Sequence, residues 1–293
     1  MKALVVVAPT VSADVRGMLR AALDGCCAAS SLACEICEIR PDEPIAEIVA
    51  RRVNDAVGCV VAVGGDGTVS AAAHALVGGE IPLGIVPAGT GNLVARELGI
   101  PLDVGAAVSL IAGPHRLRKV DAMAIAGRTC LLNAGVGINA EVIDSTSRLG
   151  KSLFGRSAYV GTAVWKVLQA KPQRLEIAVD GEVSAYEATD VLISNCGTLA
   201  RVLHPNGPEI RADDGKVDVC IICMKIPLEY PWYYLRKRLF PGHVNRIIHE
   251  MSARKRVVVR SDAPIAVQAD GDIIGTTPVA IEVLPKALAV MVP

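Results

Sequence analysis

The sequence of 293 residues contains 30 basic and 30 acidic side chains, and a net charge of zero argues against a general nucleic-acid-binding protein. Apolar residues make up 52% of the chain and the mean hydropathy is +0.42, so a large core is expected, although aromatic residues contribute only 3%. No apolar run reaches the roughly 18 residues of a transmembrane helix, so none is predicted. The length suits two domains of ordinary size, or one large one.

The first part of the chain alternates short apolar runs with amphipathic segments, which predicts a parallel α/β sheet with helices on both faces. Residues 2–8 end at a proline turn and are interpreted as a core strand rather than a signal peptide, so a cytoplasmic location is expected. Further strands are expected at 32–39, 59–63 and 83–86, and helices at 12–23 (with Ser12 as N-cap), 43–56, 69–77, 92–98 and 104–111.

After about residue 115 the pattern changes to alternating or apolar runs separated by Asp-Gly turns, which predicts a second, mainly antiparallel β domain. Strands are expected at 117–126, 129–134, 174–180, 183–186, 189–194, 217–224, 256–260, 264–268 and 288–292. One helix is expected at 157–170, and its apolar positions are more typical of core packing than of a lipid-binding wall.

Two glycine-rich turns follow two of the predicted parallel strands. Residues 64–68 read GGDGT and residues 87–92 read PAGTGN. Glycines allow backbone N–H groups to approach phosphate oxygens closely, and the N-terminus of a following helix adds positive dipole. Ligands of such sheets bind at the carboxyl ends of the strands, where both turns are expected. The alternative is a glycine turn that only closes a strand–helix unit.

Two acidic turns lie in the second half. Asp270 and Asp272 flank Gly271, and paired carboxylates suit phosphoryl transfer, which needs a proton acceptor and Mg²⁺. The alternative is a type I′ hairpin turn with two solvated carboxylates. Asp214 lies in an Asp-Asp-Gly turn that is either a magnesium site or a bare acidic turn.

The nine cysteines are odd in number and scattered, which favours reduced thiols over a disulfide framework. Two pairs have CxxC spacing, Cys34/Cys37 and Cys220/Cys223, and each pair falls within a predicted strand. Residues three apart in a strand point to opposite faces, so core cysteines are favoured over a zinc site.

Taken in order, the motifs at 64–68, 84–92, 133–140, 213–218 and 268–272 resemble those of the diacylglycerol kinase catalytic domain, and the bacterial soluble lipid kinases most of all. The resemblance implies an ATP-binding domain at 1–118, a β-sandwich-like lipid domain at 119–286, and a strand at 287–293 that returns to the first domain. ATP and lipid would meet in the cleft between them. The implied reaction is Mg²⁺-dependent transfer of the ATP γ-phosphate to the hydroxyl of diacylglycerol or a related lipid alcohol.

The resemblance also assigns roles to residues. Asp270 and Asp272 would carry the general-base function, and the expected magnesium ligands are Asp214 and the backbone carbonyls of Arg211 and Lys216. In the nucleotide loop, Asp66 is expected to orient the loop or a magnesium-bound water. The expected ATP-binding set is Thr10, Gly64, Gly65, Asp66, Gly67, Thr68, Val69, Ser70, Ala71, Gly89, Thr90 and Asn92.

Six positions depart from the family pattern. Ala8 replaces the Asn of an Asn-Pro turn, Arg40 stands where a Thr often contacts ATP, and Asp272 replaces a Glu. The family's Asn-Glu pair after GGDGT is replaced by Ser70 and Ala71, and an Asp after the second glycine turn is replaced by Leu93. These changes predict either an active kinase with altered contacts or a weakened one.

The segment 227–245 holds five of the nine aromatic residues beside a basic cluster. It is interpreted either as a patch for peripheral contact with the inner face of the membrane, where the lipid would be taken up, or as packing against the β domain. Two other functions stay open: an NAD kinase-like enzyme and a non-catalytic lipid- or nucleotide-binding protein. The sequence indicates neither the lipid alcohol nor the oligomeric state.

Overall fold

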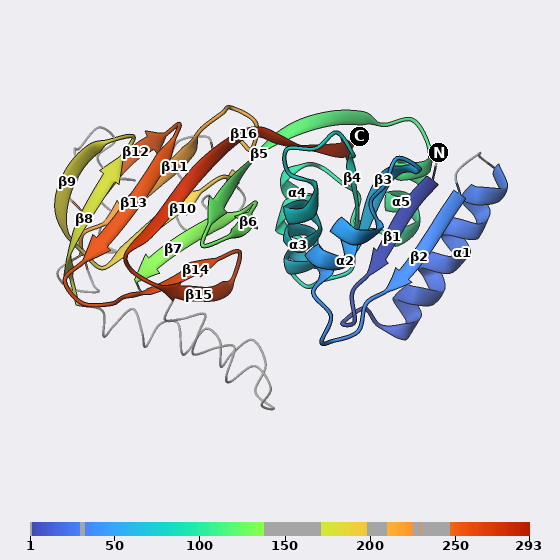
Figure 1. Cartoon of the computed structure of the whole chain (residues 1–293), viewed down its shortest axis with the longest axis horizontal. Helices are drawn as coiled ribbons and strands as arrows, with labels where there is room; N and C mark the ends of the chain where they lie inside the picture. Colours follow the sequence, from blue (N-terminus) through green and yellow to red (C-terminus); the bar gives the residue numbers. More distant parts are fainter. Residues whose placement is uncertain (1, 30–32, 138–170, 198–209, 225–228, 230–246) are drawn as a thin grey trace.

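The computed structural model describes residues 2–29, 33–137, 171–197, 210–224, 229 and 247–293 (Figure 1). The first domain is built on parallel strands in the order β2 (Ala33–Glu38), β1 (Lys2–Val7), β3 (Val57–Gly64) and β4 (Leu83–Pro87). The predicted parallel α/β domain is confirmed. Its helices are α1 (Ala13–Ala29), α2 (Ile45–Arg52), α3 (Asp66–Leu76), α4 (Leu93–Glu97) and α5 (Val104–Ala112).

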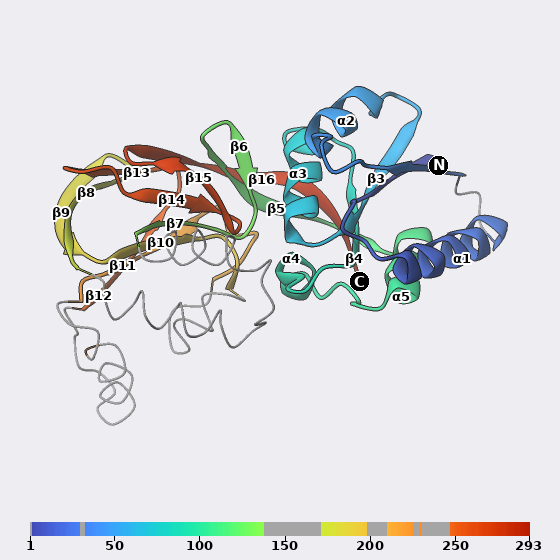
Figure 2. The same ribbon diagram turned by 90° about the horizontal axis from the view of Figure 1, so that it is seen from below.

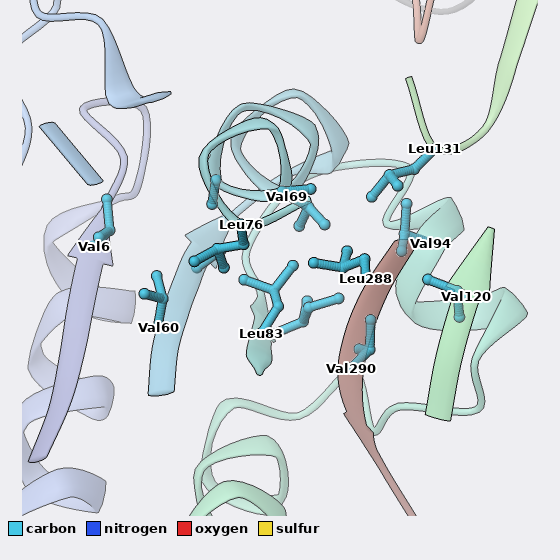
Figure 3. Close-up of a cluster of buried hydrophobic side chains, with 14 of the residues drawn as sticks. Val6, Val60, Val69, Leu76, Leu83, Val94, Val120, Leu131, Leu288 and Val290 are labelled. Atoms are coloured by element: carbon cyan, nitrogen blue, oxygen red, sulfur yellow. The ribbon is translucent and has the colours of Figure 1, made fainter. Parts of the chain in front are cut away.

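Helices cover both faces of this sheet because its inner strands are apolar on both sides. On one face, α2, α3 and α4 pack against the sheet in an apolar cluster that includes Val60. Figure 3 shows part of that cluster. On the other face, α1 and α5 pack against a second apolar cluster that includes Val61. Cys37 joins the first cluster and Cys34 the second, so this CxxC pair is divided between the two faces. Among the described helices, none is long and apolar enough to cross a membrane.

The second domain packs two antiparallel layers face to face, as predicted for the β-rich part (Figures 1 and 2). One layer contains β8 (Gln173–Val179), β9 (Glu182–Ala188) and β13 (Arg256–Ser261). The other has the order β12 (Ile248–Ala253), β11 (Val217–Ile222), β10 (Asp190–Ser194), β7 (Asn133–Gly137), β14 (Ala266–Ala269) and β15 (Asp272–Thr276). Buried aliphatic side chains such as Ile177 and Ile193 fill the space between the layers.

Two long strands, β5 (Arg116–Ile125) and β16 (Val279–Val292), run through both domains and pair with each other. At one end of β16, Ile281 lies opposite Val257 of β13, and at the other end Val290 lies opposite Leu83 of β4. The first sheet therefore continues without a break into one layer of the second domain (Figure 1).

Some predicted elements were wrong in detail. The strand expected at 129–134 is divided into β6 (Arg128–Cys130) and β7, because the backbone N–H groups between them bind a carboxylate rather than a neighbouring strand. Strands β12 and β15 were not predicted, because their polar and glycine-containing sequences lie at sheet edges where one side is solvated. The helix expected at 157–170 lies outside the described residues, as does the segment 227–245 apart from Glu229.

Asp180 ties two turns of the second domain together. Its oxygens accept hydrogen bonds from the backbone N–H groups of Arg254 (2.8 Å), Lys255 (2.8 Å) and Arg256 (2.9 Å). Desolvation raises the pKa of Asp180, but these N–H groups outweigh it, so the pKa lies below its ordinary value of 3.8. A lowered folded-state pKa stabilises the fold above the unfolded-state pKa, and that stability is lost as the pH falls through the folded-state pKa.

We therefore expect Asp180→Asn to lower the urea midpoint at pH 7 and the two proteins to converge as the pH falls below about 4. Asp262→Asn, an exposed carboxylate after β13, serves as the control and is expected to leave the midpoint unchanged. A constant difference between wild type and Asp180→Asn from pH 7 to pH 2 would contradict this account.

Candidate active site

The two glycine turns meet at the carboxyl edge of the parallel sheet. Gly64 ends β3 and Gly65 is the N-cap of α3, while Ala88 N donates a hydrogen bond to Gly64 O at 2.8 Å. A Cβ atom on Gly89 would lie 2.5 Å from Gly65 Cα. The loops thus touch backbone to backbone and expose main-chain atoms where side chains would otherwise stand.

Gly89→Ala tests this contact. Because the added methyl meets backbone rather than a flexible side chain, the loops must separate, and we expect a loss of about 1–3 kcal/mol in unfolding free energy together with weaker ATP binding. Calorimetric titration and thermal unfolding measure the two effects. Gly17→Ala, whose Cβ would meet no atom within 4 Å, is the matched control. Unchanged ATP affinity in Gly89→Ala would show that the loops separate freely.

The polar side chains of the two glycine loops hydrogen-bond the backbone and so stabilise the loop conformations. Asp66 Oδ1 accepts a hydrogen bond from Val94 N at 3.0 Å, which joins the start of α3 to α4 and fits a loop-orienting role. Asn92, at φ 49°, closes its own turn, since Oδ1 accepts from Gly89 N (3.0 Å) and Nδ2 donates to Gly89 O (2.9 Å). Thr68 is buried against Gly64.

Other expected nucleotide contacts lie at the same edge. Thr10 and Thr90 are exposed in the turns after β1 and β4, and Gly67 is exposed in the first turn of α3. Val69 and Ser70 are buried in α3 and Ala71 is half-buried there, and Val69 packs in the apolar cluster on this side of the sheet. Leu93, one of the departures from the family pattern, packs against the apolar cluster of α3 and α4.

A groove of about 500 Å³ opens beside the end of β2 and the helix α2. Three guanidinium side chains border it, from Arg40, Arg51 and Arg52, together with the carboxylates of Glu38 and Glu43. Arg40 N is held by Glu43 Oε2 at 2.9 Å, which fixes the turn. Because β2 is two strands from β3, this groove extends the carboxyl edge that carries the glycine loops.

Asp270 is the most heavily bonded carboxylate of the described residues. Its five donors are the Ser70 hydroxyl (2.5 Å), the Cys130 thiol (2.7 Å), and the backbone N–H groups of Leu131 (2.8 Å), Leu132 (2.9 Å) and Asn133 (3.1 Å). Burial, and then the charge of Asp270, raise the pKa of the Cys130 thiol well above its usual range, so the sulfur keeps its proton and donates. These contacts join α3 of the first domain to the turn between β6 and β7.

The turn that follows holds the second carboxylate differently. Asp270 and Gly271 have φ values of 47° and 93°, the geometry of a type I′ hairpin turn, and Gly271 N donates to Gln268 Oε1 at 3.1 Å. Asp272 is exposed at the start of β15, and no described residue donates a hydrogen bond to its carboxylate. The turn is the hairpin predicted as the alternative, but only Asp272 is a solvated carboxylate, because Asp270 is anchored by its five donors.

Comparison with known proteins decides the family. A family model described as the diacylglycerol kinase catalytic domain matches residues 2–125, and one described as the YegS C-terminal NAD kinase beta sandwich-like domain matches residues 133–292. The chain belongs to the diacylglycerol kinase catalytic domain family. Its two domains are those of the bacterial lipid kinases in that family.

Individual relatives are similar to most of the chain. A diacylglycerol kinase of Mycobacterium tuberculosis is 28% identical over 262 residues, which cover 84% of this chain and 80% of that protein. An uncharacterised protein of Synechocystis is 31% identical over 242 residues, covering 80% of this chain and 54% of the relative, so the chain spans about half the length of that protein. A solved diacylglycerol kinase structure from Bacillus anthracis shares the fold, with a TM-score of 0.76, 22% identity, and coverage of 100% of this chain and 97% of that chain.

The turn that resembles the family's magnesium site contains an unsatisfied oxygen. Asp214 Oδ1 is buried and accepts no hydrogen bond from the described residues, while Oδ2 lies 3.7 Å from Lys216 Nζ. No cluster of three acidic, histidine or cysteine side chains occurs in the described part of the chain, so a metal here would also need backbone carbonyls and water. Mg²⁺ accepts that combination, and the carbonyls of Arg211 and Lys216 belong to the same turn, so these residues fit the ion.

The neighbouring Asp213 has a structural partner instead. Its Oδ2 lies 2.9 Å from Arg118 Nη2, and Oδ1 lies 3.3 Å from Arg211 Nε. Partial burial raises the pKa of Asp213, but the hydrogen bonds and charges of the two arginines outweigh it and lower the pKa. Of the two adjacent acids, Asp214 is therefore the better candidate for the metal ligand.

Two buried polar residues near the site were missed in the sequence. Asp121 in β5 is 0% exposed, and its oxygens accept from Lys286 N (2.6 Å) and Gly215 N (2.7 Å). Asn195 Nδ2 donates to the carbonyls of Asp121 and Leu131, both at 2.9 Å. The signal for Asp121 was a single charge within the apolar run at 120–125, since such a charge is rarely buried without partners.

Proposed function

We propose that this protein is an ATP- and Mg²⁺-dependent lipid kinase that phosphorylates the hydroxyl of diacylglycerol or a related lipid alcohol. The observation that carries the proposal is the hydrogen bond between Ser70 and Asp270, 200 residues apart. It fastens the acidic turn of the second domain to α3, close to the glycine loops. A phosphate-binding loop and a pair of carboxylates on facing domains are the parts that phosphoryl transfer requires.

The glycine loops would hold the phosphates of ATP. The first-turn N–H groups of α3, at Asp66 and Gly67, have no intrahelical acceptors, and the helix dipole adds partial positive charge. The exposed Thr10, Thr90 and the groove beside Arg40 provide polar surface for the rest of the nucleotide along the same edge. A volume of about 500 Å³ lies within the usual range for small-molecule sites.

Asp272 would accept the proton of the lipid hydroxyl. The new bond joins that oxygen to the γ-phosphorus, the bond between the γ-phosphorus and the bridging oxygen breaks, and ADP leaves. Asp270 is poorly suited to take the proton, because five donors already occupy its two oxygens. Asp272 has free oxygens and lies two residues away on a rigid turn, so it supports the base role better.

Magnesium bound with nucleotide would neutralise charge on the transferring phosphate. The separate Asp214 turn would hold a structural ion, and this can be tested without nucleotide. We expect Mg²⁺ to raise the wild-type melting temperature, with a gain of about 2.7 kcal/mol at 100 times the dissociation constant. Asp214→Asn is expected to lose this response, and the exposed Asp55→Asn to retain it. Equal responses in all three proteins would contradict a site at Asp214.

The test of the proposed function is transfer of radiolabel from γ-labelled ATP to a panel of lipid alcohols in mixed vesicles with Mg²⁺, with NAD as an additional acceptor. Labelled lipid that disappears in Asp272→Asn would support the proposal. Labelling of NAD alone would favour an NAD kinase-like activity, and ATP binding without any labelled product would favour a binding protein. A requirement for vesicles over dispersed lipid would support uptake at a membrane surface.

A further inference from the structure

Ser70 occupies a special position among the five donors around Asp270. The thiol of Cys130 and the three backbone N–H groups belong to the second domain, whereas the Ser70 hydroxyl comes from the nucleotide helix α3. Ser70 is only 7% exposed, so water competes little for this bond. A hydroxyl bonded to a carboxylate is a charge-assisted hydrogen bond, which is short and directional.

The connection from the glycine loop to this bond is rigid. Ser70 follows Asp66 by one helical turn, so both lie on the same face of α3. A displacement of the first turn of α3 on phosphate binding would therefore reach the Ser70 hydroxyl.

The path from Asp270 to Asp272 is also short. Asp270 and Gly271 form a two-residue type I′ turn, and Asp272 begins β15 directly after it. Gln268 also fixes this turn, because its Oε1 accepts from Gly271 N and its Nε2 donates to Asn133 Oδ1 at 2.7 Å. The direction of the Asp272 side chain thus depends on where Asp270 is held.

A second contact on the same helix provides a natural comparison. His74 Nδ1, one turn beyond Ser70, lies 3.0 Å from Thr129 Oγ1. The contact joins α3 to β6, two elements that lie near each other in Figure 2. It crosses the same domain boundary but does not touch the acidic turn. Loss of either contact loosens the boundary, whereas only loss of the Ser70 contact removes the donor that the first domain provides to Asp270 and leaves the carboxylate with its four donors from the second domain.

We propose that Ser70 is a positioning residue that couples nucleotide binding at the glycine loop to the placement of Asp272 through Asp270. This inference rests on the proposed kinase function. Ser70 itself does not touch the reacting atoms and carries no proton in the reaction. Ser70 is one of the departures from the family pattern noted in the sequence, and its hydroxyl provides a hydrogen-bond donor at this position.

The kinetic test is a graded series: Ser70→Thr keeps the hydroxyl, Ser70→Cys keeps a weak donor, and Ser70→Ala removes it. We expect kcat to fall in that order, by about 10–100-fold in Ser70→Ala, with the KM for ATP within about twofold of wild type. His74→Ala is expected to keep kcat within about twofold. Equal kcat values in Ser70→Ala and His74→Ala, or an equal loss in Ser70→Thr and Ser70→Ala, would overturn the proposal. Ser70→Cys decides the matter if Ser70→Ala does not fold.

Hydrogen exchange with and without ATP gives a second readout that needs no lipid. ATP is expected to protect the amides of the β14–β15 hairpin in wild type and His74→Ala, and to lose this effect in Ser70→Ala. If wild type binds ATP but phosphorylates no lipid, the kinase proposal fails while the exchange data still decide the coupling. Protection that is unchanged in Ser70→Ala overturns the coupling even if the lipid is phosphorylated.

Discussion

Replacing Asp272 by Asn is expected to lower kcat for lipid phosphorylation by about 10²–10⁴-fold, the usual contribution of a positioned general base. The amide has nearly the same shape but accepts no proton. Because Asp272 is exposed and receives no hydrogen bond from the described residues, the free energy of unfolding and the affinity for ATP should not change. Steady-state kinetics with labelled ATP, paired with ATP titration, measure both quantities.

Asp262→Asn is the matched control for Asp272, since it also removes an exposed carboxylate from the second domain. It is expected to retain full activity. A substitution of Asp272 that left kcat within about threefold of wild type would remove the base role from this residue. Extension of the side chain in Asp272→Glu restores the family's usual acid and is expected to retain activity.

Replacing Asp270 by Asn, in contrast, is expected to lower stability, with a loss of about 3 kcal/mol in the free energy of unfolding. The amide offers one oxygen in place of two, and its NH₂ group must face donors that a carboxylate oxygen satisfied. Each buried donor left without an acceptor costs about 1–3 kcal/mol. Urea denaturation measures the loss.

Asp272→Asn is the control for this prediction as well, because it lies in the same turn and is expected to change stability by no more than about 0.5 kcal/mol. Equal stability of the two variants would mean that the five contacts of Asp270 contribute little to the fold. An Asp270→Asn protein of normal stability and full activity would also contradict the anchoring role.

The sequence predicted the architecture because the periodicity of its apolar residues is strong. All four parallel strands and all five helices of the first domain were expected, with differences only at their ends. Ser12 was expected to cap α1, and its Oγ lies 3.4 Å from Val15 N. The glycine-rich loops were recognisable because close backbone contact leaves no other residue suitable at Gly89.

The arrangement of the candidate site could not be predicted in the same way, because it depends on contacts between distant segments. Ser70 was noted as a departure from the family, yet its bond to Asp270 appears only when the domains meet. The turn at Leu131 and Leu132 was expected to be strand. Their apolar side chains do not indicate that their backbone N–H groups bind a carboxylate. The catalytic roles of Asp270 and Asp272 remain predictions, although their different surroundings suggest different tasks.

The passage of β16 through both domains has a consequence for the order of folding. Residues 288–292 complete the sheet of the first domain beside β4, yet they are synthesised after the entire second domain. The first domain therefore cannot finish folding while it leaves the ribosome, and the edge of β4 stays open during that time. Pairing across such a long sequence separation is slow, so the nascent chain is expected to depend on chaperones until both domains close together.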